Sequence, residues 1–261
     1  MAPKKHKPLR ILCTNDDGIH APGLKALETI AHALSEDVWV VAPETEQSGA
    51  SHSLTLSMPL RLREAGERKW AVQGTPTGCV MMAVRHVMLE NPPDLVLSGV
   101  NRGANIADDV TYSGTIAAAM EGTVLGIPSI ALSQAFGLSG GSTVKWSCAQ
   151  SHAPEIIKTL VAAGWPANVL INLNFPDVLA DSVKGVEVTV QGRRDESLAQ
   201  IEARQDARGV PYYWIGFRRV MSNPPSGTDL HAIYNGAISV TPLHLNLTER
   251  SCLDDLRRAL G

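Results

Sequence analysis

The sequence predicts an α/β fold with a mainly parallel sheet covered by helices on both faces. Segments typical of strands and helices alternate from residue 9 to residue 173, and that order generates βαβ units. The strand segments are short and continuously apolar, as expected for strands buried on both sides. From residue 184 onward, strand-rich alternating segments predict antiparallel hairpins. We therefore expect an α/β core with a strand-rich C-terminal extension involved in oligomerisation.

The composition fits a folded protein with a substantial core. The 261 residues are 44% hydrophobic and 19% charged, and the net charge is −3. This length accommodates one large domain, or one domain with an extension. The near-neutral charge favours neither a nucleic-acid polymer nor a membrane as a partner. The four cysteines are scattered without a C-x-x-C pair, so we expect reduced thiols and a cytoplasmic location.

Helices are predicted where apolar residues recur at helical spacing and where capping residues precede them. Thr75 and Pro76, for example, suit the cap and the first position of a helix. Pro154 is expected to interrupt a helix, and the charged segment 193–209 is expected to be a solvated surface. The predicted helices cover residues 21–34, 75–89, 116–125, 144–163 and 251–260. The predicted strands cover residues 9–14, 37–42, 59–63, 69–73, 94–98, 129–132, 168–173, 186–190, 212–220 and 237–242.

One connection, from the strand at 94–98 to the helix at 116–125, is unusually long. Loops in α/β proteins usually hold about 2–6 residues. This connection is rich in glycine and asparagine over residues 99–105 and then contains Asp108 and Asp109. A loop above the carboxyl end of a strand, closed by a helix N-terminus, is where open α/β sheets bind anions. We therefore expect part of a functional site here.

Oxygen-bearing side chains follow three of the predicted parallel strands. Asp16 and Asp17 follow the first strand, Ser48 lies in the loop after the second, and Asn101 follows the strand at 94–98. Because the carboxyl ends of parallel strands lie along one rim of a sheet, we expect these residues to converge. Taken alone, the two aspartates are explained slightly better by an ordinary Asx-turn than by a metal site. Together the four residues form an all-oxygen set suited to Mg²⁺ or Mn²⁺ rather than zinc.

Ser113, Gly114 and Thr115 open the helix that follows the long loop. Their backbone N–H groups and hydroxyls are suited to hold a phosphate, although an N-cap followed by small residues for close packing explains them too. The sequence contains no P-loop, no G-x-G-x-x-G and no G-x-S-x-G. A metal beside an anion site, without a nucleophilic Cys or a Ser/His pair, points to metal-assisted hydrolysis of a phosphoester.

A series of short motifs follows in order and covers nearly the whole chain after residue 7. The motifs are Thr-Asn-Asp-Asp-Gly (14–18), Ala-Pro (42–43) with Gln-Ser-Gly (47–49), Gly-Thr-Pro (74–76), Ser-Gly-Val-Asn (98–101), Tyr-Ser-Gly-Thr (112–115) and Ser-Val-Thr-Pro-Leu (239–243). Together they resemble the survival protein SurE family. The resemblance implies a Rossmann-like core, metal-dependent hydrolysis of nucleoside 5′- and 3′-monophosphates by an activated water, and assembly into homodimers or homotetramers.

The resemblance also implies roles for individual residues. Gly78 and Ala107 depart from it, because the family usually has an acidic residue and a glycine at these positions. One Mg²⁺ or Mn²⁺ ion per subunit is expected on four ligands, of which the two aspartates and the asparagine also act in catalysis: Asp16, Asp17, Ser48 and Asn101. Phosphate contacts are expected from Asn105, Ser113, Gly114 and Thr115.

Three regions follow from this reading. Residues 1–8 are expected to form a disordered basic tail, and residues 9–183 the catalytic core. Residues 184–261 are expected to form a hairpin and oligomerisation region whose terminal helix packs back on the core. The leading hypothesis is a nucleoside monophosphate phosphatase. Two alternatives stay open: a broader phosphomonoesterase or exopolyphosphatase at the same site, and a regulatory module that binds metal or nucleotide without turnover.

Overall fold

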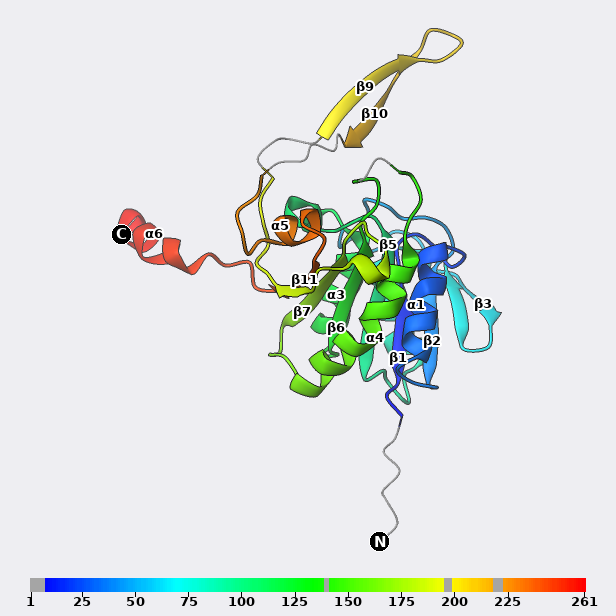
Figure 1. Cartoon of the computed structure of the whole chain (residues 1–261). Coiled ribbons are helices and arrows are strands. Elements are labelled where there is room, and N and C mark those ends of the chain that lie inside the picture. The colour runs from blue at the N-terminus through cyan, green and yellow to red at the C-terminus, as the bar shows by residue number, and fades with distance from the viewer. Residues whose placement is uncertain (1–7, 139–140, 195–198, 218–222) are drawn as a thin grey trace.

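The computed structural model describes residues 8–138, 141–194, 199–217 and 223–261 (Figure 1). Within these residues one nine-stranded sheet has the order β3-β4-β2-β1-β5-β6-β7-β11-β8. The six strands from β4 to β7 in this order run parallel, whereas β3 and β11 are antiparallel to their inner neighbours. The strands are β1 (Ile11–Thr14), β2 (Val38–Pro43), β3 (Leu62–Gly66), β4 (Lys69–Val72), β5 (Leu95–Arg102), β6 (Ser129–Gln134), β7 (Val169–Phe175), β8 (Val186–Val188) and β11 (Ile238–His244).

Helices cover both faces of this sheet, as the sequence predicts. α1 (Pro22–His32) and α4 (Trp146–Ala163) pack on one face. The other face carries α2 (Pro76–Met82) and α3 (Gly114–Val124). Successive residues of β1 point to opposite faces, so Ile11 and Cys13 pack beneath α1 and α4 while Leu12 packs beneath α2 and α3. This two-sided burial explains why the strands read as unbroken apolar runs.

Several element boundaries differ from the prediction. β5 extends to Arg102, so the first residues of the expected long loop belong to the strand. α4 continues through Pro154 because Ala153 and Ile157 hold that stretch in the core. β3 begins later than expected, and α2 passes into a π-helical turn that ends at Val87. A short helix, α5 (Asp229–Tyr234), was not predicted.

The C-terminal part of the chain is divided differently from the prediction. β9 (Ala199–Gln205) and β10 (Pro211–Phe217) form an antiparallel hairpin that projects from the body (Figure 1). Residues 200–209 of the charged segment are exposed, as predicted for a solvated surface, but they include most of the strand β9, which was not predicted. Residues 195–198 of that segment lie outside the described residues. β8 and β11, in contrast, extend the main sheet beyond β7. Strands from both sides of residue 184, the expected boundary of the catalytic core, therefore belong to one sheet.

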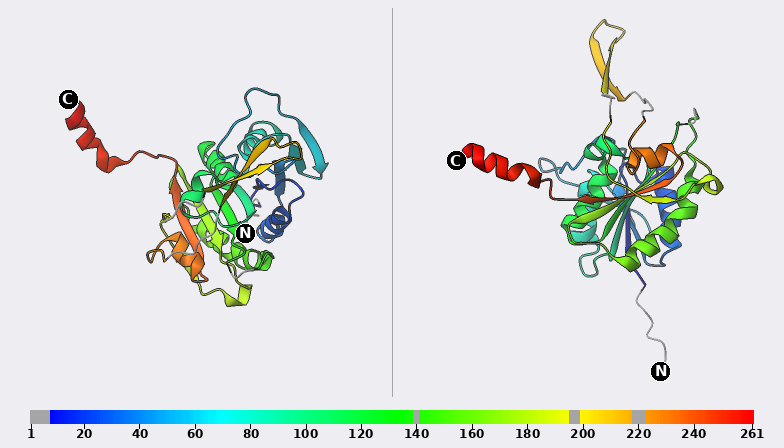
Figure 2. Two further views of the ribbon diagram at one scale, coloured as in Figure 1. Left: turned by 90° about the horizontal axis from the view of Figure 1, so that it is seen from above. Right: turned by 60° about the vertical axis from the view of Figure 1, so that its left-hand side comes forward.

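Helix α6 (Leu253–Leu260) forms where predicted but extends away from the body, as Figure 2 shows. Leu256 is 55% exposed and Leu260 is 87% exposed. The prediction that this helix packs back on the core is therefore wrong within one chain. Residues 1–7 of the expected tail, and residues 218–220 of a predicted strand, lie outside the described residues. In the ranges that are described, no helix combines the length and the apolar character needed to cross a membrane.

The first turn of α2 provides a test of helix stability. Thr75 caps the helix by accepting a hydrogen bond from the Gly78 backbone N–H at 3.1 Å. A Cβ at Gly78 would lie 3.4 Å from Thr75 Oγ1 and 3.7 Å from Leu60 Cδ1, which are ordinary contacts. Gly78→Ala is expected to raise the free energy of unfolding by about 0.5–1 kcal/mol. Calorimetry should record a rise in Tm of about 1–4 °C, and a lower Tm would contradict this reading.

Candidate active site

The candidate site lies where the sheet changes its winding direction. From β1 the chain continues to β2 on one side, while β5 pairs with β1 on the other, with Thr14 opposite Ser98. Such a switch point leaves a crevice outside the carboxyl ends of the strands, and ligands bind there in open α/β sheets. Asp16 and Asp17 directly follow β1, and Asn101 lies at the end of β5.

Asp16 is the buried member of the aspartate pair. It is 5% exposed, and its Oδ1 accepts a hydrogen bond from the Thr115 hydroxyl at 2.5 Å. Gly114 packs so closely that a Cβ there would lie 2.9 Å from Asp16 Cβ and 3.0 Å from Oδ2. The Gln47 backbone N–H donates to the Asp16 carbonyl at 2.8 Å, which ties the Ser48 loop to the end of β1. The start of α3 and the loop after β2 therefore both meet Asp16.

The other proposed metal ligands are also held by local hydrogen bonds. Asp17 Oδ2 accepts from the Arg102 backbone N–H at 3.2 Å. The Asn101 side chain donates its Nδ2 to the Gly103 carbonyl at 2.9 Å, so its Oδ1 remains as an acceptor. The Ser48 hydroxyl donates to Glu46 Oε1 at 2.8 Å and keeps its oxygen lone pairs. Each residue thus retains an oxygen that is chemically able to bind a cation.

The donor set fits a hard divalent cation. Burial raises the pKa of Asp16 to about 6, partly opposed by the Thr115 hydrogen bond, and the Asp17 charge raises it further. Burial is also the main cause of the raised pKa of Asp17. A cation would offset the cost of these poorly solvated carboxylates. Among the described residues, no cluster of three or more His, Cys, Asp or Glu side chains competes as a metal site. Oxygen ligands of this kind suit Mg²⁺ or Mn²⁺.

The raised pKa of Asp16 predicts a pH dependence of stability without metal. Between the ordinary carboxyl pKa of 3.8 and about 6, the folded protein keeps a proton that the unfolded chain releases. The free energy of unfolding of the metal-free protein should therefore fall as the pH rises through this window, by up to about 3 kcal/mol. Urea unfolding in EDTA at several pH values measures it. Asp16→Asn should flatten this part of the profile, and identical profiles for both proteins would contradict the prediction.

The expected phosphate-binding residues have two different environments. Ser113 is the N-cap of α3, where its hydroxyl oxygen accepts a hydrogen bond from the Ile116 N–H at 3.1 Å. Gly114 begins the helix next to Asp16. Thr115 is fully buried, and its hydroxyl donates a hydrogen bond to the Asp16 carboxylate.

Asn105, in the loop between β5 and α3, is hydrogen-bonded to a buried group of amide side chains on β7. Its Nδ2 donates to Ser133 Oγ at 2.8 Å, and its backbone N–H donates to Asn174 Oδ1 at 2.9 Å. Its carbonyl accepts from Asn172 and Asn174 at 2.8 and 3.2 Å. The structure thus places Asn105 as an anchor of the connection from β5 to α3, the central loop. Sequence reasoning missed Asn172 and Asn174, although two asparagines inside an apolar strand were a usable signal.

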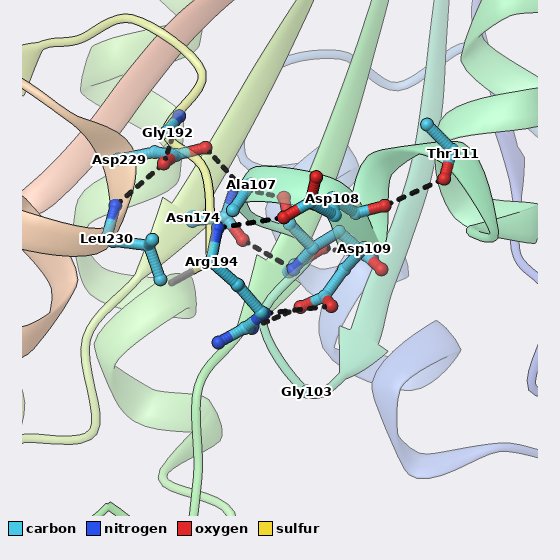
Figure 3. A network of polar contacts seen from close by, with 12 residues as sticks. Gly103, Ala107, Asp108, Asp109, Thr111, Asn174, Gly192, Arg194, Asp229 and Leu230 are labelled. Carbon is cyan, nitrogen blue, oxygen red and sulfur yellow. Dashed lines mark hydrogen bonds and ion pairs between the residues drawn. The ribbon is translucent and has the colours of Figure 1, made fainter. Parts of the chain in front are cut away.

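Ala107 has a backbone conformation that is more usual for glycine. Its φ is 52°, in the left-handed region, and it begins a 3₁₀ turn that spans Ala107–Thr111. Figure 3 shows how the carboxylate of Asp229, from α5, reaches the Ala107 N–H. Arg194 forms an ion pair with Asp109 in the same turn. Sequence reasoning missed Asp229 and Arg194, because neither lies near the loop in the sequence.

A histidine–glutamate contact also lies outside the predicted site residues. Glu121, on α3, is 6% exposed and its Oε2 lies 3.1 Å from His52 Nε2. Ser51 donates its hydroxyl to the Thr111 carbonyl at 2.9 Å. These contacts fasten the loop that carries Ser48 to α3 and to the turn before it. The buried glutamate gave no signal in the sequence, because it follows the small residues of the helix without a pattern of its own.

Comparison with known proteins agrees with the fold and the motifs. The family model described as "Survival protein SurE" matches residues 11–197. A "5'-nucleotidase SurE" of Parvibaculum lavamentivorans is 67% identical over 261 residues, which cover 100% of this chain and 94% of that protein. Another, of Methylorubrum extorquens (strain PA1), is 59% identical over 241 residues, with 92% and 95% covered. The crystal structure of the SurE protein from Aquifex aeolicus superposes with a TM-score of 0.84 at 38% identity, covering 97% and 100% of the two chains. The chain described here therefore belongs to the survival protein SurE family.

Proposed function

We propose that this protein is a divalent-metal-dependent 5′-nucleotidase that hydrolyses nucleoside monophosphates to a nucleoside and phosphate. Its relatives at 67% and 59% identity carry the name 5'-nucleotidase SurE. The observation that carries the proposal is the contact between the two halves of the site. Asp16, at the end of β1, is bonded to Thr115 and packed against Gly114 at the start of α3. A cation site and a helix N-terminus suited to an anion therefore adjoin.

In this proposal one Mg²⁺ or Mn²⁺ ion per subunit binds to Asp16, Asp17, Ser48 and Asn101. When bound, the ion supplies Lewis acidity toward the phosphoryl group and its attacking water. Thr115 orients the Asp16 carboxylate through its hydroxyl. The loop after β2 carries Ser48 and is tied to Asp16 through Gln47.

The phosphate end of the site consists of Ser113 and Gly114 at the N-terminus of α3. A helix N-terminus offers free backbone N–H groups and a positive dipole end to anionic oxygens. The Ser113 hydroxyl oxygen caps α3 by accepting a hydrogen bond from the Ile116 N–H. Its hydroxyl proton remains available to donate to a phosphate oxygen. Asn105 contributes by fixing the loop that leads to this end, and the Thr115 side chain acts through Asp16.

A substrate screen with added metal tests the function. The purified protein is incubated with Mn²⁺ or Mg²⁺ and with 5′- and 3′-mononucleotides, short polyphosphate or p-nitrophenyl phosphate, and phosphate release is measured. We expect the highest kcat/KM on mononucleotides and loss of turnover in EDTA. A higher kcat/KM on polyphosphate would favour a broader phosphatase. Metal-dependent nucleotide binding without phosphate release would identify a regulatory module, and either result would overturn the proposal.

We further propose that the protein is a cytoplasmic homodimer or homotetramer. The β9–β10 hairpin exposes large apolar side chains: Tyr213 is 64% exposed, Trp214 is 58% and Ile215 is 73%. α6 exposes Leu256 and Leu260 in the same way. Exposed apolar surface on projecting elements indicates contact with another chain. Light scattering on the wild type and on Trp214→Ser/Ile215→Ser tests it, and a monomeric wild type would refute it. The four cysteines are free thiols, which supports a reducing location.

A further inference from the structure

A carboxylate far from the site in the sequence holds the loop that leads to the phosphate end. Asp229 begins α5 and is fully buried. Its Oδ2 accepts a hydrogen bond from the Ala107 N–H at 2.8 Å, and its Oδ1 accepts from the Gly192 and Leu230 N–H groups at 2.8 and 2.7 Å. Figure 3 shows the carboxylate between these three backbone groups. The bonds join α5, the segment after β8 and the central loop in one place.

The packing around Asp229 is close. A Cβ on Gly192 would lie 2.8 Å from Asp229 Oδ1, so only a glycine lets this backbone approach the carboxylate. Gln191 adds a second hold on the loop, because its Nε2 donates to the Ala107 carbonyl at 2.9 Å. Both backbone groups of Ala107 are therefore bonded to residues from the C-terminal part of the chain.

The bond to Ala107 has a specific consequence for its backbone. Alanine disfavours the left-handed region because its Cβ approaches the neighbouring carbonyl oxygen, whereas glycine enters it freely. Ala107 nevertheless has a φ of 52°. The Asp229 carboxylate accepts from the Ala107 N–H at 2.8 Å, and hydrogen bonds to an ionised acceptor are stronger than those between neutral groups. It therefore offsets a conformational cost that a glycine at this position would not have.

The segment controlled by this bond leads directly to the phosphate end. The 3₁₀ turn Ala107–Thr111 follows Ala107, the Tyr112 N–H bonds to the Asp109 carbonyl, and Ser113 then caps α3. Asn105 is fixed independently by the amide group on β7. A change in the Ala107 backbone would therefore be taken up between Ala107 and Ser113, on the phosphate side.

We propose that Asp229 is a positioning residue for the hydrolytic reaction, which holds Ala107 in its left-handed conformation and thereby places Ser113 and the N-terminus of α3 for phosphate. The proposal rests on the phosphate end assigned under the proposed function. It predicts weaker phosphate binding and slower turnover when the bond is lost, with unchanged metal binding at Asp16, Asp17, Ser48 and Asn101.

The experiment compares Asp229→Asn with Asp206→Asn in the full-length, metal-loaded protein. Asp206 is a matched control, because its carboxylate also accepts backbone N–H groups, from Arg208 and Val210, but lies in the exposed turn of the β9–β10 hairpin. For Asp229→Asn we expect kcat/KM to fall about 10–100-fold and the inhibition constant of inorganic phosphate to rise about 10-fold. The Kd for Mn²⁺, measured by calorimetry, should stay within about twofold. Asp206→Asn should match the wild type.

A rescue separates positioning from general stability. Adding Ala107→Gly to Asp229→Asn removes the conformational cost, so it should recover most of the lost phosphate affinity. Gln191→Ala, which leaves no buried charge unpaired, should shift the phosphate inhibition constant in the same direction by a smaller factor and remains informative if Asp229→Asn does not fold. Unchanged phosphate inhibition in the folded Asp229→Asn protein, or in Gln191→Ala where Asp229→Asn does not fold, would overturn the proposal. So would a double variant without recovery.

Ser113→Ala distinguishes this proposal from the assignment on which it rests. If Ser113→Ala weakens phosphate inhibition and Asp229→Asn does not, the phosphate end is correctly assigned and the role of Asp229 is wrong. If Ser113→Ala leaves phosphate inhibition unchanged, the assignment of the phosphate end fails first.

Discussion

Asp16→Asn is expected to lower kcat/KM about 10³-fold while the protein stays folded. Loss of one carboxylate weakens the cation site, and a bound metal contributes several kcal/mol to stabilisation of a phosphoryl transition state. The fold should persist, because asparagine keeps an acceptor for the Thr115 hydroxyl and fills the same volume. The variant also removes a carboxylate whose burial raises its pKa to about 6, so it should be at least as stable as the wild type without metal.

Three measurements on this variant distinguish loss of metal binding from loss of turnover and from loss of folding. Phosphate release reports turnover, calorimetric titration with Mn²⁺ reports metal affinity, and circular dichroism reports folding. Asp254→Asn serves as the control, because that carboxylate is 82% exposed on α6. Wild-type turnover by the Asp16→Asn protein in EDTA would rule out the metal mechanism. Normal Mn²⁺ affinity with lost turnover would show that Asp16 acts on the substrate rather than on the cation.

Gly23→Ala is expected to destabilise the protein by about 3 kcal/mol, although alanine is the better helix former. Gly23 lies in the first turn of α1, and a Cβ there would lie 2.0 Å from the Val100 carbonyl oxygen and 3.1 Å from the Trp146 ring. Because the obstacle is the backbone of β5, no side-chain rotation relieves it. The helix must move away from the sheet. Thermal unfolding should show a Tm lower by about 6–12 °C.

Gly78→Ala is the matched control for this prediction. It makes the same substitution in the first turn of another helix, where a Cβ meets only ordinary contacts, and it is expected to raise the Tm. The two variants should therefore change the Tm in opposite directions. Val100 also precedes Asn101, so Gly23→Ala should weaken Mn²⁺ binding as well. An equal rise in Tm for both variants would show that helix propensity outweighs the close approach at Gly23.

The contact between Asp17 and the end of β5 followed from the sequence because it depends on one rule. Parallel strands joined by helices bring their carboxyl ends to the same rim, whatever the details of packing. The distinction between Thr115 and Ser113 did not follow, since it depends on which hydroxyl of the first helical turn meets Asp16. The role of Asp229 could not be predicted from the sequence either. Its partner Ala107 lies 122 positions away, and only the folded chain brings them together.

Two C-terminal elements, the strand β9 and the helix α6, also differ from the prediction. Among the described residues β9 pairs only with β10, and the side chains of residues 200–205, Glu202 and Arg204 among them, face solvent. No buried face therefore imposed an apolar alternation on this part of the sequence. Helix α6 shows the opposite case. Its leucines at helical spacing predict an apolar face that needs a partner, yet the pattern does not say whether that partner is the same chain or another one.

The amide side chains around Asn105 support the central loop without any titratable group, whereas the proposed cation site depends on carboxylates. Asn105, Asn172, Asn174 and Ser133 hold one end of the central loop with uncharged hydrogen bonds in a fully enclosed setting. Uncharged amides and hydroxyls have no protonation equilibrium in the range where carboxylates titrate. Acidification that protonates Asp16 therefore leaves this end of the loop in place. If the proposed cation leaves when Asp16 is protonated, these hydrogen bonds still hold the loop in position for the cation to bind again.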